Sequence, residues 1–166
     1  MGRWRPPAER SSPYITPEGF AALEQELKDI WLRRRDVVKA LSAAAAEGDR
    51  SENAEYIYRK KELGGLDRRI RYLQKRMPDL TVVSESPDSG KVFFGAWVEL
   101  EKDSDGSSSE YRIVGADEAQ PSDNLISMDS PLAKALLKKC IDDEVKLQLG
   151  DNSETYYIIN IRYGAQ

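Results

Sequence analysis

The sequence predicts two modules: a tail and an antiparallel coiled-coil helical hairpin, then a small α+β domain with a mainly antiparallel sheet and one helix. Apolar residues recur at heptad spacing in two segments joined by a short polar turn. The second half instead alternates β-rich runs with Gly- and Ser-containing turns. We place the tail at residues 1–14, the hairpin at 15–79 and the α+β domain at 80–166.

Charge divides the chain near the same boundary. Residues 1–77 carry 17 Lys and Arg against 12 Asp and Glu, a net charge of +5. Residues 78–166 carry 8 against 17, a net charge of −9. This asymmetry indicates modules with different partners, although ordinary unequal surface charge would give the same pattern.

Composition excludes several kinds of site. The 166 residues contain no histidine and a single cysteine, Cys140, so His-based triads, the usual zinc sites and disulfides within the chain are excluded. Any chemistry must therefore use carboxylates. No apolar run approaches the ~20 residues of a membrane helix, and the first residues lack the apolar core of a signal peptide. We therefore expect a cytoplasmic protein with no membrane partner.

The first helix is predicted to begin at Thr16-Pro17-Glu18, where Thr caps, Pro suits the first helical position and Glu favours the positive helix end. Gly48 is a natural residue for its end. Arg34 interrupts the apolar stripe once. The stripe consists of Phe20, Leu23, Leu27, Ile30, Val37, Leu41 and Ala44.

A second helix is predicted to start at once, from the segment 49–52, and to end at Pro78. Arg59 occupies a seam position between the first two members of its stripe. The pair Gly64-Gly65 is either a tolerated weak point or a bend that fits a partner. The second stripe consists of Tyr56, Leu63, Leu66, Ile70, Leu73 and Met77.

The α+β domain is predicted from short strands and one capped helix. Ser130-Pro131 should open that helix, over 132–139, by the same logic as the first helix start. The predicted strands are 81–83, 92–100, 111–115, 125–128, 144–149 and 155–163.

The turn between the helices contains the candidate catalytic residues. Asp49 and Glu52 have the spacing of a capping box, with Asp49 as the N-cap and Glu52 at the third position. The same two carboxylates, with Glu55 close by, could help hold a hard cation such as Mg²⁺. Two carboxylates bind Mg²⁺ weakly, so they would act best inside another protein's metal site. Both interpretations can hold together.

A basic face follows the turn. Lys61, Arg68 and Lys75 are seven residues apart and should stack on one side of the second helix. Because opposite charges are scarce, we expect pairing within the helix to leave this face positive, as a solvated face or as a phosphate-binding strip. Tyr56 and Tyr58 could stack on bases or pack, and packing is favoured for Tyr56. The basic residues are Arg59, Lys60, Lys61, Arg68, Arg69, Arg71, Lys75 and Arg76.

One turn motif and its flanks resemble a known family. The sequence GDRSENAEY at 48–56, followed by YRKKELGGLDRRIRYLQKRM, is similar to the Gre family of bacterial transcript-cleavage factors, and within it to the GreB type. The resemblance resumes at KVFFGAWVELE, YRIVGADE and SMDSPLAKALLKKCIDDEV, so it covers about residues 15–163. The N-terminal tail and Gly64-Gly65 depart from the family pattern.

The resemblance implies a mechanism and partners. The coiled coil would enter the secondary channel of bacterial RNA polymerase, and the second domain, similar in fold to FK506-binding proteins, would dock at the channel mouth. Asp49 and Glu52 would help hold Mg²⁺ and the attacking water, supported by the other turn residues Ser51, Asn53 and Tyr56. The basic face would hold the nascent RNA 3′ segment.

The same resemblance implies that the polymerase, and not this protein, cleaves the RNA. We therefore expect a monomer that is not itself an enzyme, with no cofactor bound alone and Mg²⁺ only in the polymerase active site. Three alternatives remain open at this point: a secondary-channel regulator that does not stimulate cleavage, a coiled-coil adaptor or chaperone-like module, and an independent Mg²⁺ nuclease. The last has too few converging acids.

Overall fold

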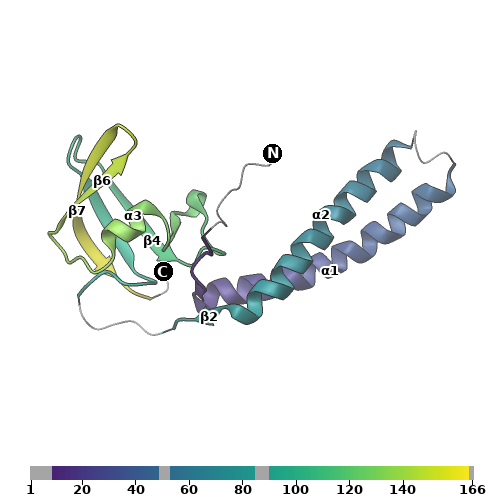
Figure 1. The fold of residues 1–166 in the computed structure, drawn as a ribbon, viewed down its shortest axis with the longest axis horizontal. Helices are drawn as coiled ribbons and strands as arrows, with labels where there is room; N and C mark the ends of the chain where they lie inside the picture. The colour runs from purple at the N-terminus through teal and green to yellow at the C-terminus, as the bar shows by residue number, and fades with distance from the viewer. Residues whose placement is uncertain (1–8, 49–52, 85–89, 165–166) are drawn as a thin grey trace, which may run out of the picture. The chain divides into compact units, whose positions relative to one another are not determined.

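The computed structural model describes residues 9–48, 53–84 and 90–164. These residues form two compact units (Figure 1). One unit comprises the described residues from Phe20 to Leu80. The other combines the described residues up to Gly19 with those from Thr81 onward, so the segment 9–19 packs with the C-terminal residues. The boundaries predicted from the sequence lie at 14/15 and 79/80.

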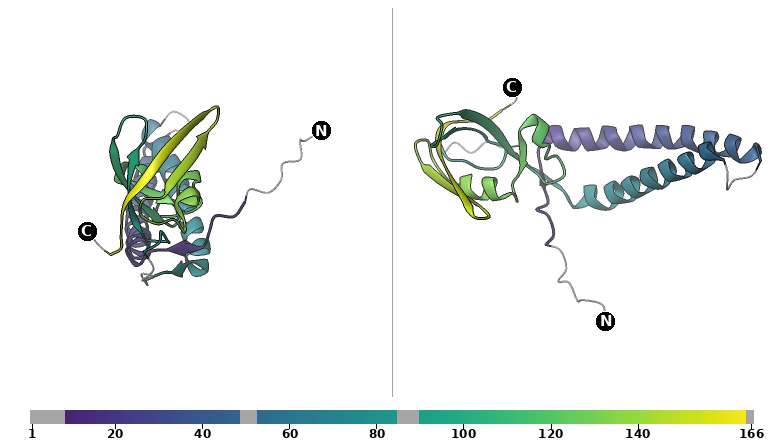
Figure 2. Two further views of the ribbon diagram at one scale, coloured as in Figure 1. Left: turned by 90° about the vertical axis from the view of Figure 1, so that its left-hand side faces the viewer. Right: turned by 90° about the horizontal axis from the view of Figure 1, so that it is seen from above.

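The first unit is the predicted helical hairpin. Helix α1 spans Pro17–Ala46 and helix α2 spans Ala54–Arg76. The two helices run side by side in Figures 1 and 2. Their antiparallel direction follows from cross-helix ion pairs, since Arg33 binds Glu62 and Arg69 binds Glu26. A short 3-10 helix, η1 (Met77–Asp79), ends α2 at the predicted proline.

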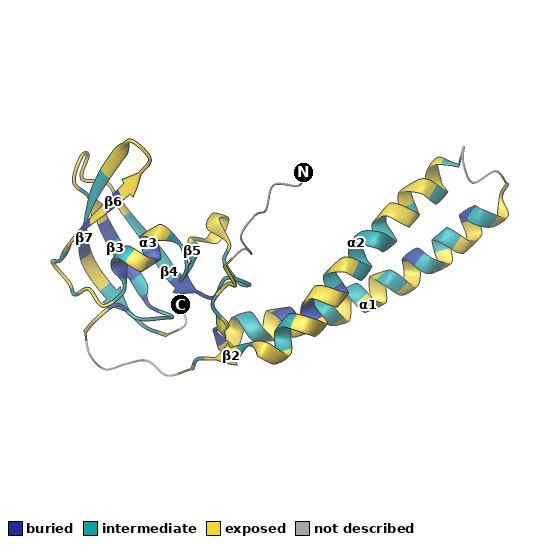
Figure 3. Cartoon of the chain, viewed as in Figure 1, coloured by how far each residue is buried: buried dark blue, intermediate teal, exposed yellow. Residues whose placement is uncertain are grey.

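The apolar seam between α1 and α2 follows the predicted heptads. Its fully buried members are Leu23, Val37, Ala44, Ile70 and Leu73. Figure 3 shows the buried positions of both helices on the surfaces that face each other. The other predicted seam residues are half-buried. The hairpin is therefore held by a narrow apolar stripe and not by a broad core.

Arg34 interrupts the seam because it has a partner on the other helix. Its Nε lies 2.7 Å from Asp67 Oδ1, and both side chains are about one-third exposed. The guanidinium also lies over the Trp31 ring, 5.9 Å from its centroid. Because both side chains remain partly exposed at the edge of the seam, forming this ion pair costs little desolvation. The pair also sets Arg34 opposite Asp67 across the two helices.

The start of α1 is tied to a distant loop. Thr16 caps the helix as predicted, accepting a hydrogen bond from Gly19 N at 3.0 Å. Thr16 also donates twice to the Glu118 carboxylate: from its backbone N at 2.7 Å and from its hydroxyl. Four residues earlier, Ser12 donates its backbone N–H and its hydroxyl to Asp129 in the same way. Two carboxylates of the C-terminal residues thus bind the segment that precedes α1.

A two-stranded parallel sheet accompanies these contacts. Strand β1 (Tyr14–Ile15) pairs with β2 (Thr81–Val82). The backbone of Gly115 packs against β1, because a Cβ built there would lie 1.9 Å from the Tyr14 carbonyl oxygen. Ile15 and Thr16 are consequently buried.

The main sheet has five strands in the order β5-β4-β3-β7-β6. All neighbouring strands are antiparallel except β4 and β5, which are parallel. Helix α3 covers one face and contributes Ala133 and Leu136 to a core with Val98, Leu100 and Ile158. The elements are β3 (Trp97–Lys102), β4 (Ser108–Val114), η2 (Pro121–Asp123), β5 (Leu125–Ser127), α3 (Pro131–Leu136), β6 (Glu144–Leu149) and β7 (Asn152–Arg162).

The predicted class of this domain is confirmed, but several boundaries were wrong. The strand predicted over 92–100 begins only at Trp97, since Gly95 has a φ of 86° and its N–H donates to the Ile113 carbonyl. The strand predicted from 111 begins at Ser108. The helix predicted to reach 139 ends at Leu136, and Lys138 has a φ of 70°. Ser130 caps this helix as predicted, accepting from Ala133 N.

Within the described part of the chain, no helix has the length and apolar character needed to cross a membrane.

Candidate functional site

The end of the hairpin is organised by Asn53. Its side-chain Oδ1 accepts a hydrogen bond from Tyr56 N at 3.1 Å, which makes Asn53 the N-cap of α2. Its Nδ2 donates to the Ala44 carbonyl oxygen at 2.8 Å, in the last turn of α1. That carbonyl is one of the groups that a helix end leaves without a partner within the helix. One amide therefore satisfies the start of one helix and the end of the other.

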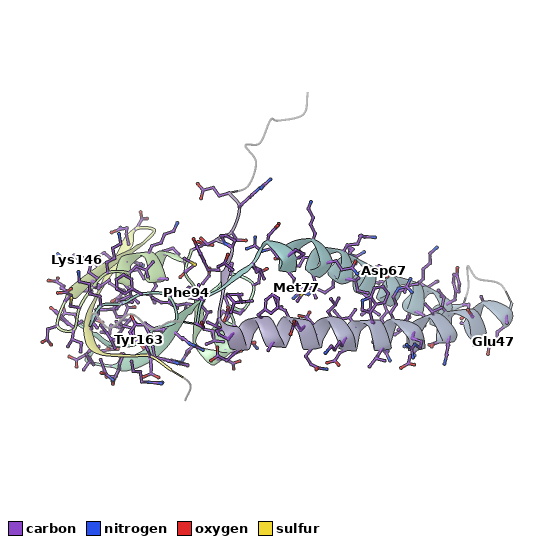
Figure 4. All side chains as sticks on the ribbon, turned by 90° about the horizontal axis from the view of Figure 1, so that it is seen from below. Glu47, Asp67, Met77, Phe94, Lys146 and Tyr163 are labelled. Carbon is purple, nitrogen blue, oxygen red and sulfur yellow. The ribbon has the colours of Figure 1, made fainter. Side chains whose placement is uncertain are left out.

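This cap corrects the predicted start of the second helix. The capping-box interpretation made Asp49 the N-cap, but α2 begins at Ala54 with Asn53 as its cap. Asp49, Ser51 and Glu52 themselves lie outside the described residues. They belong to the connection between Gly48, where φ is 130°, and Asn53. Figure 4 labels Glu47 at this end of α1 and Met77 at the opposite end of α2.

The two tyrosines near this end differ in exposure. Tyr56 is half-buried, and its backbone N–H completes the Asn53 cap. Tyr58 is 60% exposed, with the Arg59 guanidinium 5.4 Å from its ring centroid. Tyr58 thus has a largely open ring one helical turn from the tip connection, residues 47–53.

The structure divides the predicted basic residues into two groups. Arg59 contacts Glu55 at 2.8 Å and Glu62 at 3.1 Å, and Arg69 makes two hydrogen bonds to Glu26 at 2.7 and 3.0 Å. The expectation that pairing within the helix leaves this face positive was therefore wrong for Arg59, whereas Arg69 is paired from the other helix. Arg76 also has a partner in the structure.

The Arg59 cluster is electrostatically coupled across the helices. Glu62 binds Arg33 of α1 at 2.6 Å as well as Arg59. The hydrogen bond from Arg33, followed by that from Arg59, holds the pKa of the Glu62 carboxyl below its ordinary value of 4.5. The hydrogen bonds to Glu55 and Glu62 raise the pKa of the Arg59 guanidinium. This network links Arg33 of α1 to Glu62 and Arg59 of α2.

The second group lies opposite the seam. The members without an ion pair to a described residue, all five of them exposed, are Lys60, Lys61, Arg68, Arg71 and Lys75. Seven-residue spacing places Lys61, Arg68 and Lys75 on one side of α2, about 20° apart per step. The outer side of α2 therefore carries several basic side chains without an ion-pair partner among the described residues.

Three features of the structure were not predicted from the sequence. Tyr72 is 43% exposed beside Arg68 and Lys75, with the Arg69 guanidinium 5.3 Å from its ring centroid. An aromatic residue at helical spacing among basic residues was the available signal for it. The Asn53–Ala44 bond joins residues on two elements, so sequence spacing gave no signal. The Thr16–Glu118 contact, 102 positions apart, gave none either.

No group of three or more Cys, Asp or Glu side chains among the described residues is arranged to hold a metal ion. The acids near the tip that the structure describes, Glu47 and Glu55, are both exposed.

Comparison with known proteins identifies the class. The family described as "Transcription elongation factor, N-terminal" (GreA_GreB_N) matches residues 13–82, and "Transcription elongation factor, GreA/GreB, C-term" matches residues 86–163. The hairpin and the sheet domain are thus the two halves of a two-domain transcription elongation factor. The chain belongs to the GreA/GreB family.

Two relatives share most of the sequence. Transcription elongation factor GreB of Xanthomonas axonopodis pv. citri is 56% identical over 167 residues, covering 99% of each chain. Transcription elongation factor GreB of Pseudomonas aeruginosa is 51% identical over 165 residues, covering 98% of each. A solved structure of the transcription factor Gfh1 is 23% identical with a TM-score of 0.45, and covers 92% of this chain and 99% of its own.

Proposed function

We propose that this protein stimulates RNA cleavage by backtracked bacterial RNA polymerase. In this mechanism the hairpin enters the secondary channel of the polymerase and presents the tip connection to its active site. The polymerase cleaves the nascent RNA near its 3′ end, and extension resumes from the new end. The protein itself makes and breaks no covalent bond.

The bond from Asn53 to Ala44 is the observation that best supports this proposal. It joins the start of α2 to the last turn of α1, with the bonded atoms 2.8 Å apart, and these are the two helix ends that flank Asp49 and Glu52 in the sequence. Helix α1 has 30 residues and α2 has 23, which at ~1.5 Å per residue makes arms of about 45 and 35 Å. Arms of this length can carry two acids deep into a partner.

Two carboxylates fit a supporting role toward Mg²⁺. This hard cation prefers oxygen ligands and normally keeps several waters, so Asp49 and Glu52 would complete a site that the polymerase largely supplies. Bound there, Mg²⁺ would supply Lewis-acid stabilisation of the oxygens in an in-line phosphodiester hydrolysis. The role of this chain's own residues is to position the two acids beside the attacking water. Ser51, Asn53 and Tyr56 would support that placement.

The remaining surfaces have separate roles in the proposal. Lys61, Arg68 and Lys75 would attract the extruded RNA 3′ segment through its phosphates, with the salt dependence of such contacts. The sheet domain would dock at the mouth of the channel, and one copy would suffice. Because transcription occurs in the bacterial cytoplasm, the protein would act there.

The test uses purified bacterial elongation complexes that have been backtracked in the presence of Mg²⁺. With RNA labelled at its 5′ end, we expect shortened transcripts that resume extension when the protein is added. Asp49→Ala and Glu52→Ala should abolish the shortening but keep polymerase binding, measured by native gel shift. Glu47→Ala, which removes an exposed acid beside the same connection, is the matched control and should remain active.

Other results would support different functions. Binding without shortening by the unaltered protein would indicate a secondary-channel regulator. Failure to bind polymerase would favour an adaptor with no part in transcription. Loss of binding in Asp49→Ala and Glu52→Ala would mean that the acids mainly hold the tip connection together.

A further inference from the structure

A small cavity lies in the compact unit that contains the sheet, and the proposed function gives it no role. Its volume is about 90 Å³. The residues that line it come from separate segments of the chain and include Glu18 at the start of α1, Ser84, Phe94, Arg112 of β4 and Tyr163. Figure 4 labels two of them, Phe94 and Tyr163. All of the lining residues belong to one unit, so the cavity is a feature of that unit's own fold.

Arg112 supplies the positive charge of this cavity. Its side chain is only 14% exposed, and its Nε donates to the Gly95 carbonyl oxygen at 3.2 Å. Its Nη2 lies 3.9 Å from Glu18 Oε2, which is too long for a hydrogen bond. A guanidinium has five N–H donors, and those of the two terminal nitrogens make no hydrogen bond with a described residue. Because a largely buried charge with unused donors is costly, an anion in the cavity would stabilise the folded protein.

Arg162 provides an internal comparison for Arg112. Both arginines are cross-strand neighbours of Trp97, and their guanidinium carbons lie 5.9 Å (Arg112) and 4.7 Å (Arg162) from the centroid of its ring. Arg162 makes two hydrogen bonds to the Glu110 carboxylate, at 3.3 and 2.5 Å. Of the two arginines on this ring, the one that faces the cavity is therefore the one without a carboxylate at hydrogen-bond distance.

Glu18 is a weak partner for Arg112. Its side chain is 56% exposed, and an ion pair this exposed and this long contributes little. An acid in the first turn of a helix is favourable whether or not it meets an arginine, and Glu18 is in the first turn of α1. Glu18 can therefore turn toward solvent when a stronger anion approaches Arg112.

We propose that this cavity binds one phosphate group through the terminal nitrogens of Arg112. The planar fork of a guanidinium matches two oxygens of a phosphate, and the Ser84 hydroxyl, which lines the same cavity, would donate to a third. A phosphate carries more negative charge than a carboxylate and so competes better with Glu18. The volume of about 90 Å³ has room for a phosphate group but not for a nucleoside. The ligand is therefore free phosphate, or a phosphate monoester whose remainder stays outside.

The test measures phosphate binding by the full chain alone, so it does not depend on the proposed function. Inorganic phosphate is titrated by isothermal calorimetry at constant ionic strength, with chloride as the balancing anion. Arg112→Gln should weaken binding by about tenfold or more, because the charged donors are lost. Arg162→Gln, which removes the other arginine on the Trp97 ring, is the matched control and should bind phosphate like the unaltered protein.

Glu18→Gln gives the opposite sign and separates a binding site from a simple ion pair. If Glu18 competes with phosphate for Arg112, its removal should tighten phosphate binding by about twofold to fivefold. If Arg112 and Glu18 form only a structural pair, Glu18→Gln should leave the unaltered protein's response to phosphate unchanged, and that result would overturn the proposal.

Two further probes identify the ligand. Methyl phosphate that binds as tightly as inorganic phosphate would identify a site for monoesters, whereas binding of inorganic phosphate alone would identify a site for the free ion. Acetate has one charge and two oxygens and should bind at least about tenfold more weakly than phosphate. Equal binding of acetate and phosphate would contradict the assignment of a phosphate group.

Folding of each variant is checked by circular-dichroism melting. Should Arg112→Gln fail to fold, Arg112→Lys keeps the charge without the planar fork and should still bind phosphate more weakly than the unaltered protein. Phosphate should also raise the melting midpoint of the unaltered protein, since it binds the folded state. Absence of both binding heat and a melting shift would overturn the proposal. Phosphate binding by a protein that fails to stimulate cleavage would defeat the proposed function and leave this site standing.

Discussion

Asn53 and Ala44 join the two helices at the end of the hairpin, through a hydrogen bond of 2.8 Å from the Asn53 amide to the Ala44 carbonyl. Ala44 is itself buried in the seam, and its carbonyl also accepts from Glu47 N at 3.2 Å. The last packed layer of the coiled coil and the cap of α2 are therefore one structural unit. Its function in the proposed mechanism is to join the two helix ends that flank Asp49 and Glu52 in the sequence.

Substitutions at Asn53 separate its two roles. Asn53→Ala loses both the cap and the bridge, and should lower the free energy of unfolding by about 1–2 kcal/mol. Asn53→Asp keeps an acceptor for Tyr56 N but has no donor for the Ala44 carbonyl, so it should be less destabilising yet still reduce cleavage stimulation. Urea unfolding and the cleavage assay measure the two effects. Full cleavage activity in Asn53→Asp would contradict the positioning role of the bridge.

The glycines of α2 should be replaceable at a gain in stability. Gly64→Ala and Gly65→Ala should each stabilise the helix by about 0.5–1 kcal/mol, because alanine loses less backbone entropy on folding. The nearest atoms are the mobile end of Arg68, at 3.4 and 3.8 Å, which can move aside. Thermal melting should therefore show a higher midpoint for both variants.

Gly115 is the contrasting control for those substitutions. A Cβ there would lie 1.9 Å from the Tyr14 carbonyl oxygen, a backbone atom that cannot move without disturbing β1. Gly115→Ala should lower the melting midpoint by several degrees through overpacking. A neutral result at Gly115, or destabilisation at Gly64 and Gly65, would show that the described packing does not govern these positions.

Thr16 and Glu118 should be energetically coupled. Glu118 accepts two hydrogen bonds from Thr16, so Thr16→Ala removes one of them as well as the N-cap of α1. Glu118→Ala leaves the buried Thr16 N–H and hydroxyl short of partners. A double-mutant cycle of unfolding free energies should give an interaction of about 1–3 kcal/mol. If the effects of the two single substitutions on the free energy of unfolding simply add, Thr16 and Glu118 do not stabilise each other.

The Glu62 network should make the hairpin sensitive to acid. Because hydrogen bonds from Arg33 and Arg59 lower the pKa of Glu62 in the folded state, the carboxylate contributes stability above its ordinary pKa of 4.5. That contribution is lost as the pH falls from about 4.5 through the lowered value. Glu62→Gln should therefore show a smaller drop in melting temperature between pH 6 and acid than the unaltered protein. An identical drop in both would exclude Glu62 as a source of the acid sensitivity.

Local patterns predicted the hairpin well because the residues of its apolar seam recur at regular spacing along each helix. Heptad spacing alone identified Leu23, Val37 and Leu73 as seam residues, and all three are buried. Thr16 and Ser130 were identified as caps because capping needs only residues close in sequence. The interruption at Arg34 was visible in the stripe, although its partner Asp67 on the other helix was not.

Several of the errors arise from contacts between residues that are distant in the sequence. The Asp49 capping box was a plausible local pattern, but Asn53 also donates a hydrogen bond to the Ala44 carbonyl, which no spacing rule includes. The basic face looked unpaired because Glu26, the partner of Arg69, lies on the other helix. Likewise the strand predicted at 92–100 shortened because Gly95 turns toward Ile113 of another strand.

The central claim is that Asp49 and Glu52 help hold Mg²⁺ during RNA cleavage, and its most direct test is the Mg²⁺ dependence of the cleavage rate. Backtracked complexes with 5′-labelled RNA would be titrated with Mg²⁺ in the presence of unaltered protein, Asp49→Asn, Glu52→Gln or the control Glu47→Gln. We predict that the first two variants need at least about tenfold more Mg²⁺ for half-maximal rate, and that Glu47→Gln matches the unaltered protein. An unchanged Mg²⁺ dependence in Asp49→Asn and Glu52→Gln, whatever their maximal rate, would contradict the account.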